Sequence, residues 1–481
     1  MLFNSLTYLI FLLIVVILYW LLPLRSRLYL IFFSSLVFYG FWRIEFIALL
    51  LLSTFVDWFI SIKIYKSAQK NKSKLLILGV SFNIALLFYF KYLIFFTSNL
   101  IGFANFFGLH IDQFVTNIIL PLGISFYTFQ TISYTVDVYR GHQKPEKDFI
   151  TYACYVTFFP QLVAGPILRA SEVIPQFKRR PKLNYEIISN GLRLIFCGLF
   201  LKVVLADNIS TMVDEGFLAP AYLMSAWDVW TLSFLFGFQI YFDFSAYSHI
   251  AIGTASLMGL NFPKNFNFPY LSSSPREFWK RWHISLSSWI RDYVYLPLAG
   301  TKVINSSEGG MPVSLTEKKK IKSLFLTWGI MGFWHGANWT FFLWGIYHAI
   351  IITGYKFMKN YIKIKNKLYA SLFGFILTLP LMMLSWIPFR AASLEDTFVM
   401  WLHIINPYSY DGFGMRENVY LVTFLLLVGI VINFLYFDKI LPFLRKSKVI
   451  YFSLHLSFFC FLTALVFIFL RPVNQFIYFQ F

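Results

Sequence analysis

One octapeptide, residues 332–339 (GFWHGANW), combines residue types that could carry out acid–base chemistry. It lies within residues 323–355, a stretch without Lys, Arg, Asp or Glu that is apolar enough to cross a membrane. A histidine at bilayer depth is costly, so His335 indicates a functional site. Histidine is the commonest proton-transfer residue near neutral pH, and we predict that role for His335. Trp334 and Asn338 are suited to line the cavity around it.

A second group of candidates lies between residues 241 and 283. Asp243 and Ser245 are polar residues in an apolar segment, and we take them as candidates for substrate binding or for lining a tunnel. The stretch PREFWKRWH at 275–283 mixes basic and aromatic side chains. It fits either an amphipathic helix that anchors the protein at the membrane surface or a cytoplasmic site for a phosphate-bearing substrate. The second interpretation selects Arg276, Lys280 and Arg281 as binding residues.

Two further stretches contain helix-breaking or polar residues in apolar surroundings: PLGISFYTFQ at 121–130 and FFPQLVAGP at 158–166. Hydrogen bonds between helices would explain the polar groups of the first stretch. Prolines and a glycine interrupt any helix in the second. Non-helical backbone survives at membrane depth only where it is buried in protein or lines a cavity. We therefore expect a re-entrant element beside the cavity.

The spacing of small residues and histidines near His335 gives two more predictions. Gly329, Gly332 and Gly336 lie at i, i+3 and i+7, so they form a smooth helix face that another helix can approach closely. His348 follows His335 along the chain. On an uninterrupted helix the two would lie about 20 Å apart on opposite sides, so we do not expect one metal site or one dyad.

Several function classes lack their sequence signatures. The motifs HExxH, GxSxG, GxxxxGKS/T and GxGxxG are absent, which argues against zinc proteolysis, serine-esterase chemistry, ATP hydrolysis and hydride transfer. The cysteines are scattered in apolar surroundings, so we predict no disulfide framework, no metal site and no bound cofactor. The net charge of +19 is dispersed over many loops, which argues against nucleic-acid binding.

The elements that position these residues belong to a membrane protein. Hydrophobic residues make up 58% of the chain and charged residues 13%, against roughly 45–50% and about 25% in soluble proteins. We predict an all-α polytopic integral membrane protein with about 11 transmembrane helices plus re-entrant and interfacial helices. Separate spans are placed at 75–90 and 93–109, and at 221–242 and 244–260. We treat residues 1–481 as one domain, with its core motifs at 121–348.

Basic clusters predict the orientation. Arg25 and Arg27 follow the first span, and a dense cluster at 63–74 comes two spans later. Short loops rich in Lys and Arg stay in the cytoplasm, so the N-terminus is expected outside. The first span lacks the basic start and cleavage site of a signal peptide and is expected to be retained. The same rule places further basic segments inside, where they attract anionic membrane lipids: 169–182, 276–281, 302–322, 356–367 and 438–448.

Five blocks in order resemble the membrane-bound O-acyltransferases, and more narrowly the bacterial alginate O-acetyltransferase branch. They are PLGISFYTFQ, FFPQLVAGP, YFDFSAYSHIAIG, PREFWKRWHISLSSWIRDYVYLPLAG and GFWHGANWTFFLWG, within residues 121–348. The resemblance implies a helical fold around a central tunnel and acyl transfer from a thioester to a hydroxyl. It makes His335 the catalytic histidine. His283 occupies the position of a second family-typical residue whose role is less defined.

The resemblance also implies substrates and a location. The donor would be cytoplasmic acetyl-CoA, entering near Arg276, Lys280 and Arg281. The acceptor would be an exported envelope polysaccharide, such as alginate or peptidoglycan, outside the bacterial cytoplasmic (inner) membrane. A periplasmic or extracellular acetyltransferase partner would pass the acetyl group on to the polysaccharide. Asn338 or His283 would stabilise the oxyanion.

Two alternatives stay open from the sequence. The first keeps the same fold but acts on a lipid, a protein or a teichoic-acid D-alanylation system. The second is a transporter or channel without chemistry, since broken helices and intramembrane polar residues are also compatible with transport.

Overall fold

The computed structural model of the protein describes residues 1–115, 117–163, 165–300, 316–361, 366–435, 447–469 and 476. Every regular element in these ranges is a helix or helical turn, which confirms the all-α class. Three predicted basic loops fall partly outside the described residues, at 302–315, 362–365 and 438–446.

The elements follow one another along the chain in three groups. The first group is α1 (Leu6–Leu21), α2 (Leu24–Gly40), α3 (Glu45–Lys66), α4 (Gln69–Leu87), the π turn η1 (Phe88–Tyr92) and α5 (Leu93–Phe106). The second is α6 (Ile124–Arg140), α7 (Phe149–Thr157), α8 (Phe159–Leu162), α9 (Ala170–Phe177), α10 (Tyr185–Leu199), η2 (Phe200–Ala206), α11 (Asp207–Leu218), η3 (Ala221–Leu223), α12 (Ala226–Leu257), η4 (Pro269–Leu271), α13 (Pro275–Arg281), α14 (Ile284–Ile290), η5 (Arg291–Tyr295) and α15 (Leu296–Ala299). The third is α16 (Glu317–His335), α17 (Trp339–Tyr361), α18 (Lys367–Leu384), α19 (Trp386–Arg390), α20 (Leu394–Ile405), η6 (Pro407–Tyr410), α21 (Glu417–Leu435) and α23 (Lys448–Ile468).

Long apolar helices make this a multi-pass membrane protein. Among the described residues, five stretches are long and apolar enough to cross a bilayer: Glu45–Lys66, Gln69–Phe106, Tyr185–Leu218, Trp339–Lys359 and Tyr369–Arg390. Shorter apolar helices occur at Leu6–Leu21, Glu417–Ile432 and Phe459–Ile468. The total of about 11 crossings stays a prediction.

Two of the predicted boundaries between spans are wrong. The spans placed at 75–90 and 93–109 belong to one helical stretch of 38 residues, Gln69–Phe106. The π turn η1 accommodates Lys91 there without ending the helix. The spans placed at 221–242 and 244–260 are joined in the 32-residue helix α12. Its Asp243 lies 2.8 Å from Lys202, and this pairing allows the carboxylate to stay inside a continuous helix.

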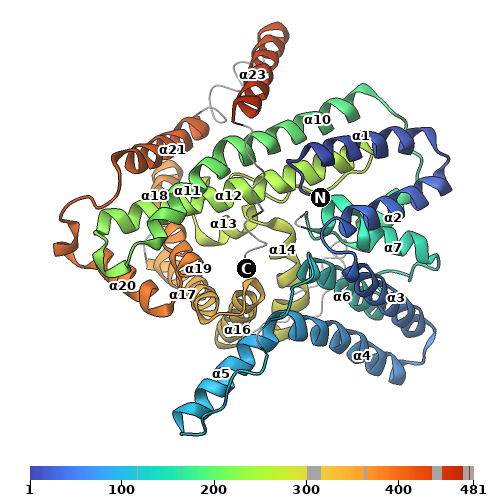
Figure 1. Ribbon diagram of the computed structural model, residues 1–481, viewed down its shortest axis with the longest axis horizontal. Helices are drawn as coiled ribbons and strands as arrows, with labels where there is room; N and C mark the ends of the chain where they lie inside the picture. The colour runs from blue at the N-terminus through green and yellow to red at the C-terminus, as the bar shows by residue number, and fades with distance from the viewer. Residues whose placement is uncertain are drawn as a thin grey trace.

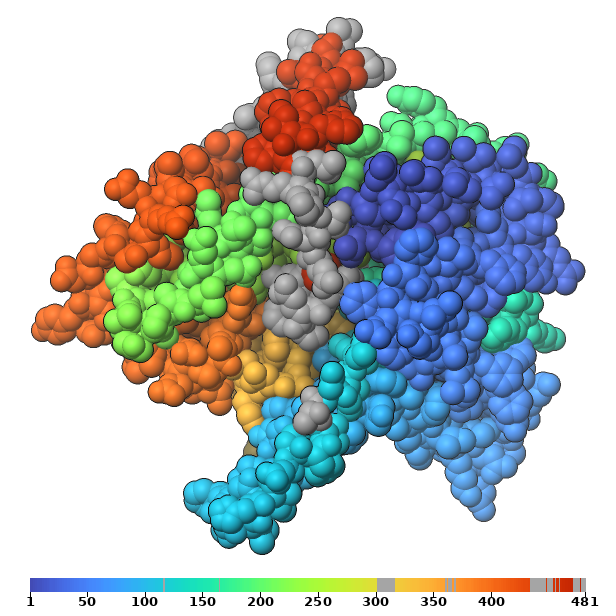
Figure 2. Space-filling view, viewed as in Figure 1, coloured from blue at the N-terminus to red at the C-terminus, as the bar shows by residue number. Residues whose placement is uncertain are grey.

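The short helices that carry the PREFWKRWH stretch occupy the middle of the molecule. In Figure 1, α13 and α14 lie centrally, with α1–α3 and α7 on one side and α17–α20 on the other. Figure 2 shows the same division of the surface, with the N-terminal helices in blue and the C-terminal ones in orange. Helix α5 extends away from the body in both views. The long helices therefore enclose the segment that follows α12.

A tight helical hairpin presents the GFWHGANW stretch. Helix α16 ends at His335, and α17 begins at Trp339 and runs back along it. A Cβ atom on Gly332 would lie 2.4 Å from the Phe341 carbonyl oxygen, and one on Gly345 would lie 2.2 Å from that of Trp328. This close packing confirms Gly329 and Gly332 as a contact face and adds Gly345 on the partner helix. Gly336 was wrongly included in the helix face, because α16 ends at His335 and Gly336 is extended.

The break after His335 also overturns the expected placement of His348. The two histidines are not on one uninterrupted helix, because residues 336–338 reverse the chain. Their rings instead contact the same indole, Trp344, with centroid distances of 4.8 Å for His335 and 4.6 Å for His348. Both therefore lie on the same side of the hairpin.

Candidate active site

His335 is the last residue of α16 and is enclosed by aromatic rings. Its side chain is buried, with 4% of its surface exposed. Ring centroids lie 4.9 Å away for Trp334, 4.8 Å for Trp344 and 5.2 Å for Phe389 of α19. Because Gly336 is extended, the helix stops at His335 and its ring projects from a helix end. This enclosure limits the rotamers of the imidazole and excludes bulk water from it.

His283 forms the corner between α13 and α14 in a strained conformation. Its φ of +39° lies in the left-handed region, which for a non-glycine residue costs on the order of 1–3 kcal/mol. The buried Nδ1 atom lies 3.1 Å from Oδ1 of Asn265. The backbone of Asn265 accepts the N–H of Ile284 at 2.9 Å. One loop residue thus fixes both the corner and the ring.

The bonds of Asn265 set the tautomer of His283. The Asn265 amide nitrogen donates to Ser248 Oγ at 3.0 Å, and Oδ1 accepts from Ser285 Oγ at 2.9 Å. Oδ1 is therefore the acceptor toward His283, and Nδ1 carries the hydrogen. The other ring nitrogen, Nε2, then carries a lone pair. It is buried and has no hydrogen-bond partner among the described residues.

Phe126 of α6 connects the two histidines. Its ring centroid lies 6.4 Å from that of His283 and 5.9 Å from that of Trp334, the neighbour of His335. Residues from α6, the α13–α14 corner and the end of α16 therefore share one aromatic core. The two histidines selected from the sequence meet there, although more than 50 residues separate them along the chain.

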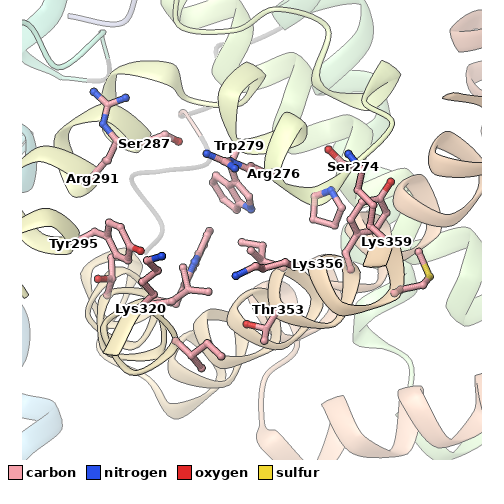
Figure 3. Close-up of a pocket in the computed structure, with 18 of the residues that line it drawn as sticks. Ser274, Arg276, Trp279, Ser287, Arg291, Tyr295, Lys320, Thr353, Lys356 and Lys359 are labelled. Carbon is pink, nitrogen blue, oxygen red and sulfur yellow. The ribbon is translucent and has the colours of Figure 1, made fainter. Parts of the chain in front are cut away.

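A large basic cavity opens between α13, η5, α16 and α17. Its volume is about 1180 Å³. Five cationic side chains line it: Arg276, Arg291, Lys320, Lys356 and Lys359. Figure 3 shows Lys320 and Lys356 directed into the space, whereas the Arg291 guanidinium points away from it and pairs with Asp292 at 2.7 Å. Glu317 contacts Lys320 and Lys356 and offsets part of this charge. Trp279, Trp328 and Met331 form its apolar wall, and Met331 is one helical turn before His335.

A much smaller cavity, called here the histidine cavity, lies at the other end of α16. It measures about 80 Å³ and is lined by His335 itself. The other lining residues are Trp42, Lys91, Leu120, Pro121, Leu122, Gly123, Ile124, Ser125, Phe126, Val163 and Trp334. The stretches 121–130 and 158–166 thus both reach this cavity, as expected of the second. The end of α16 that carries His335 lies between the two cavities.

A family model for the membrane-bound O-acyltransferases matches residues 142–389, about half of the chain. The peptidoglycan O-acetyltransferase of Helicobacter pylori is 36% identical over 403 residues, covering 78% of this chain and 72% of that protein. A probable alginate O-acetylase of Azotobacter vinelandii is 36% identical over 403 residues, covering 83% and 76% respectively. The chain belongs to the membrane-bound O-acyltransferase family. This membership confirms the resemblance and makes the protein an acyltransferase.

A more distant relative carries a different name. The teichoic acid D-alanyltransferase of Bacillus subtilis is 30% identical over 259 residues, which cover 51% of this chain and 62% of that protein. Within the family, the chain is therefore similar to polysaccharide O-acetyltransferases over a larger share of its length.

Several predicted site residues of this O-acyltransferase lie elsewhere than the two cavities. Asp243 pairs with Lys202, which also lies 2.9 Å from Asp207. Ser245 Oγ lies 3.2 Å from Nδ1 of His249. Neither residue lines the basic cavity or the histidine cavity. Their role in substrate binding stays a prediction.

Of the three basic residues predicted between 275 and 283, one lines a cavity and two do not. Arg276 lines the basic cavity, whereas Lys280 is exposed and Arg281 pairs with Glu277 at 2.6 Å. Asn338 is exposed at the start of α17, where its Oδ1 accepts the Thr340 N–H at 3.1 Å. The structure thus brings His335, His283 and Trp334 together around one aromatic core, whereas Arg276 lies apart from them in the basic cavity.

Two residues that the sequence analysis missed contact the histidines. Asn265 holds His283, as described above. Lys91 donates from Nζ to the carbonyl oxygens of Trp334 at 2.7 Å and His335 at 3.0 Å. A signal for Lys91 was present, since it is the one charged residue in 75–109. Its charge instead suggested a boundary between two spans, so Lys91 was not predicted as a site residue.

Proposed function

We propose that the protein transfers acetyl groups from cytoplasmic acetyl-CoA to hydroxyls of an exported cell-envelope polysaccharide. The observation that carries this proposal is the position of His335 between a large basic cavity and a small cavity at the end of α16. The names of the relatives, peptidoglycan O-acetyltransferase and probable alginate O-acetylase, support a polysaccharide acceptor. The protein would act in the bacterial inner membrane, with its N-terminus outside.

The basic cavity fits the donor. Acetyl-CoA carries a pyrophosphate and a 3′-phosphate on one end and a thioester on the other. Arginine and lysine side chains bind phosphate oxygens by charge-assisted hydrogen bonds. Arg276, Arg291 and Lys359 would hold the phosphates at the mouth. The uncharged wall of Trp279, Trp328 and Met331 would guide the pantetheine arm toward His335. We expect this mouth to face the cytoplasm, because short loops rich in Lys and Arg stay on that side.

The reaction requires one proton to move twice. His335 would take the proton from an acceptor hydroxyl while its oxygen attacks the thioester carbonyl. The new C–O bond forms, the C–S bond breaks, and the imidazolium returns the proton to the leaving thiolate. His283, with its lone pair on Nε2, would accept a hydrogen bond from the hydroxyl and orient it rather than stabilise an oxyanion. No residue of the chain needs to form a covalent intermediate.

The acceptor enters from the opposite side. The histidine cavity of about 80 Å³ holds a single small group, such as a hydroxyl-bearing carbon and its neighbours, and not a polymer chain. We therefore propose that a periplasmic or extracellular acetyltransferase partner receives the acetyl group and passes it to the polysaccharide. Family membership argues against a transporter without chemistry.

The test measures acetyl-CoA consumption by purified protein and O-acetyl esters on envelope polysaccharides by mass spectrometry. We expect His335→Ala to lose roughly 10²–10⁴-fold in rate, the usual contribution of positioned acid–base catalysis. The matched control is His403→Ala, because His403 contacts Ser409 in α20 and η6 and lines neither cavity. Unchanged acetylation in correctly inserted His335→Ala would refute the proposal.

A further inference from the structure

Lys91 places a cationic group against the end of the catalytic helix. It is the one Lys, Arg, Asp or Glu among residues 75–109, and it lies in the π turn η1 of the Gln69–Phe106 stretch. A charge at bilayer depth is expensive and marks functional positions. Its ammonium binds the carbonyl oxygens of Trp334 and His335, 243 and 244 residues away in sequence. The long helix therefore binds the main chain at the end of α16 through this turn.

The end of α16 needs such a donor. The last carbonyl groups of a helix lack intrahelical partners, and they form its negative pole. Water normally satisfies them, but this helix ends in an aromatic core. The extended Gly336 prevents the next turn from supplying N–H groups. Tyr92 adds a third bond, from its hydroxyl to the Phe333 carbonyl at 3.0 Å. Two consecutive residues of η1 thus bind three consecutive carbonyls of α16.

A π turn suits this arrangement. It inserts a wider turn into an α-helix, redirects the side chains there and is frequent at functional sites. Lys91 Nζ also lies 5.9 Å from the centroid of the Trp334 ring, so the ammonium faces the ring as well as the carbonyls. The same side chain lines the histidine cavity together with His335. Its position is therefore fixed relative to both the main chain and the cavity.

We propose that Lys91 is a positioning residue for the acyl-transfer reaction. By binding the Trp334 and His335 carbonyls, it fixes the main chain from which the His335 imidazole projects into the histidine cavity. This inference rests on the proposed function, since it assigns Lys91 to the proton-transfer step of His335. Lys91 lies outside residues 142–389, which the family model matches, so the assignment comes from the contacts alone.

The deciding variant is Lys91→Met, which keeps the length and apolar stem of the side chain and removes its donors. We expect kcat to fall roughly 100-fold, because a misplacement of about 1 Å has that effect on a catalytic group. The KM for acetyl-CoA should stay within about twofold, since the donor binds at the other end of α16. Lys91→Arg, which keeps the donors and the charge, should recover most of kcat.

Asn99→Leu is the matched control. Asn99 lies on the same helical stretch, and its Oδ1 accepts the Trp339 indole N–H at 2.9 Å. It therefore joins the same helix to the same hairpin without touching the His335 main chain. If Lys91 only tethers the two elements, both variants should lower the melting temperature and leave kcat per folded protein unchanged.

The results for these variants distinguish a failure of the Lys91 proposal from a failure of the proposed function. A loss of kcat confined to Lys91→Met, with rescue by arginine, supports the inference. A normal kcat in Lys91→Met, or equal losses in Lys91→Met and Asn99→Leu, overturns it while an inactive His335→Ala keeps the proposed function. Full activity in His335→Ala removes both.

Discussion

The state of His283 is set by a side chain 18 residues earlier, Asn265. Sequence motifs were sufficient to select His283 and His335, because their surrounding blocks are distinctive. They could not select Asn265, since an asparagine in a loop has no signal until the chain folds. Lys91 was missed for a related reason: its partners are carbonyl groups 243 and 244 residues away. Polar contacts between residues far apart in the sequence cannot be predicted from local motifs.

Asn265→Ala tests this arrangement. The change leaves His283 Nδ1, Ser248 and Ser285 without their shared partner in a buried site. We expect the free energy of unfolding to fall by about 1–3 kcal/mol, the desolvation cost of an unsatisfied buried group. Activity should fall as well, because the His283 tautomer is no longer fixed.

The readouts are thermal unfolding in detergent and acetyl-CoA consumption per folded molecule. Asn267→Ala is the control, since Asn267 is an exposed amide in the same loop. Equal stability and activity in the two variants would show that the Asn265 bonds have no role in fixing His283.

At the scale of elements, the hairpin of α16 and α17 determines where His335 lies within the aromatic core. Hydropathy located the apolar stretch that contains its two helices, and the glycine pattern located part of their contact face, because both signals are local. Local signals misplaced the boundaries at Lys91 and Asp243, where a π turn and an ion pair keep polar residues inside continuous helices. The π turn and the ion pair depend on residues elsewhere in the chain, so the local sequence does not predict them.

Gly345→Ala should separate the two helices of this hairpin. A Cβ atom would lie 2.2 Å from the backbone oxygen of Trp328, so the backbones must move apart. We expect a loss of about 1–3 kcal/mol in stability, as for overpacking of a core, together with reduced activity.

Gly354→Ala provides the comparison on the same helix. No described residue lies within 4 Å of its Cβ position, so alanine should be neutral or stabilise α17 by up to about 1 kcal/mol. Thermal unfolding of the two purified variants decides the matter. Similar melting temperatures would contradict a tight contact at Gly345.

For the whole molecule, the distribution of charge predicts how the chain lies in the membrane. The five stretches described as long enough to cross establish a multi-pass protein, but they do not give its direction. Direction follows from the basic loops alone. Beginning with the N-terminus outside, the helical stretch Gln69–Phe106 runs from the cytoplasm outward. The histidine cavity, which Lys91 lines, then faces the outer half of the bilayer.

Single cysteines in a background without Cys154, Cys197 and Cys460 test this direction. We expect Asp112→Cys, beyond the end of α5, to react with a membrane-impermeant maleimide in intact cells. Lys72→Cys, at the start of α4, should react only after the membrane is permeabilised. The reverse labelling pattern would invert the topology and move the basic cavity to the outer face.

The length of the Gln69–Phe106 stretch has a mechanical consequence. Its apolar part, residues 75–106, extends over about 48 Å, about one and a half times the roughly 30 Å of bilayer hydrocarbon. A helix in this position must tilt, or the lipid around it must thicken, to relieve the hydrophobic mismatch. Because Lys91 and Tyr92 join it to the end of α16, a change in its tilt would displace the main chain at His335. We therefore expect acyl-chain length in the surrounding lipid to alter the rate of transfer.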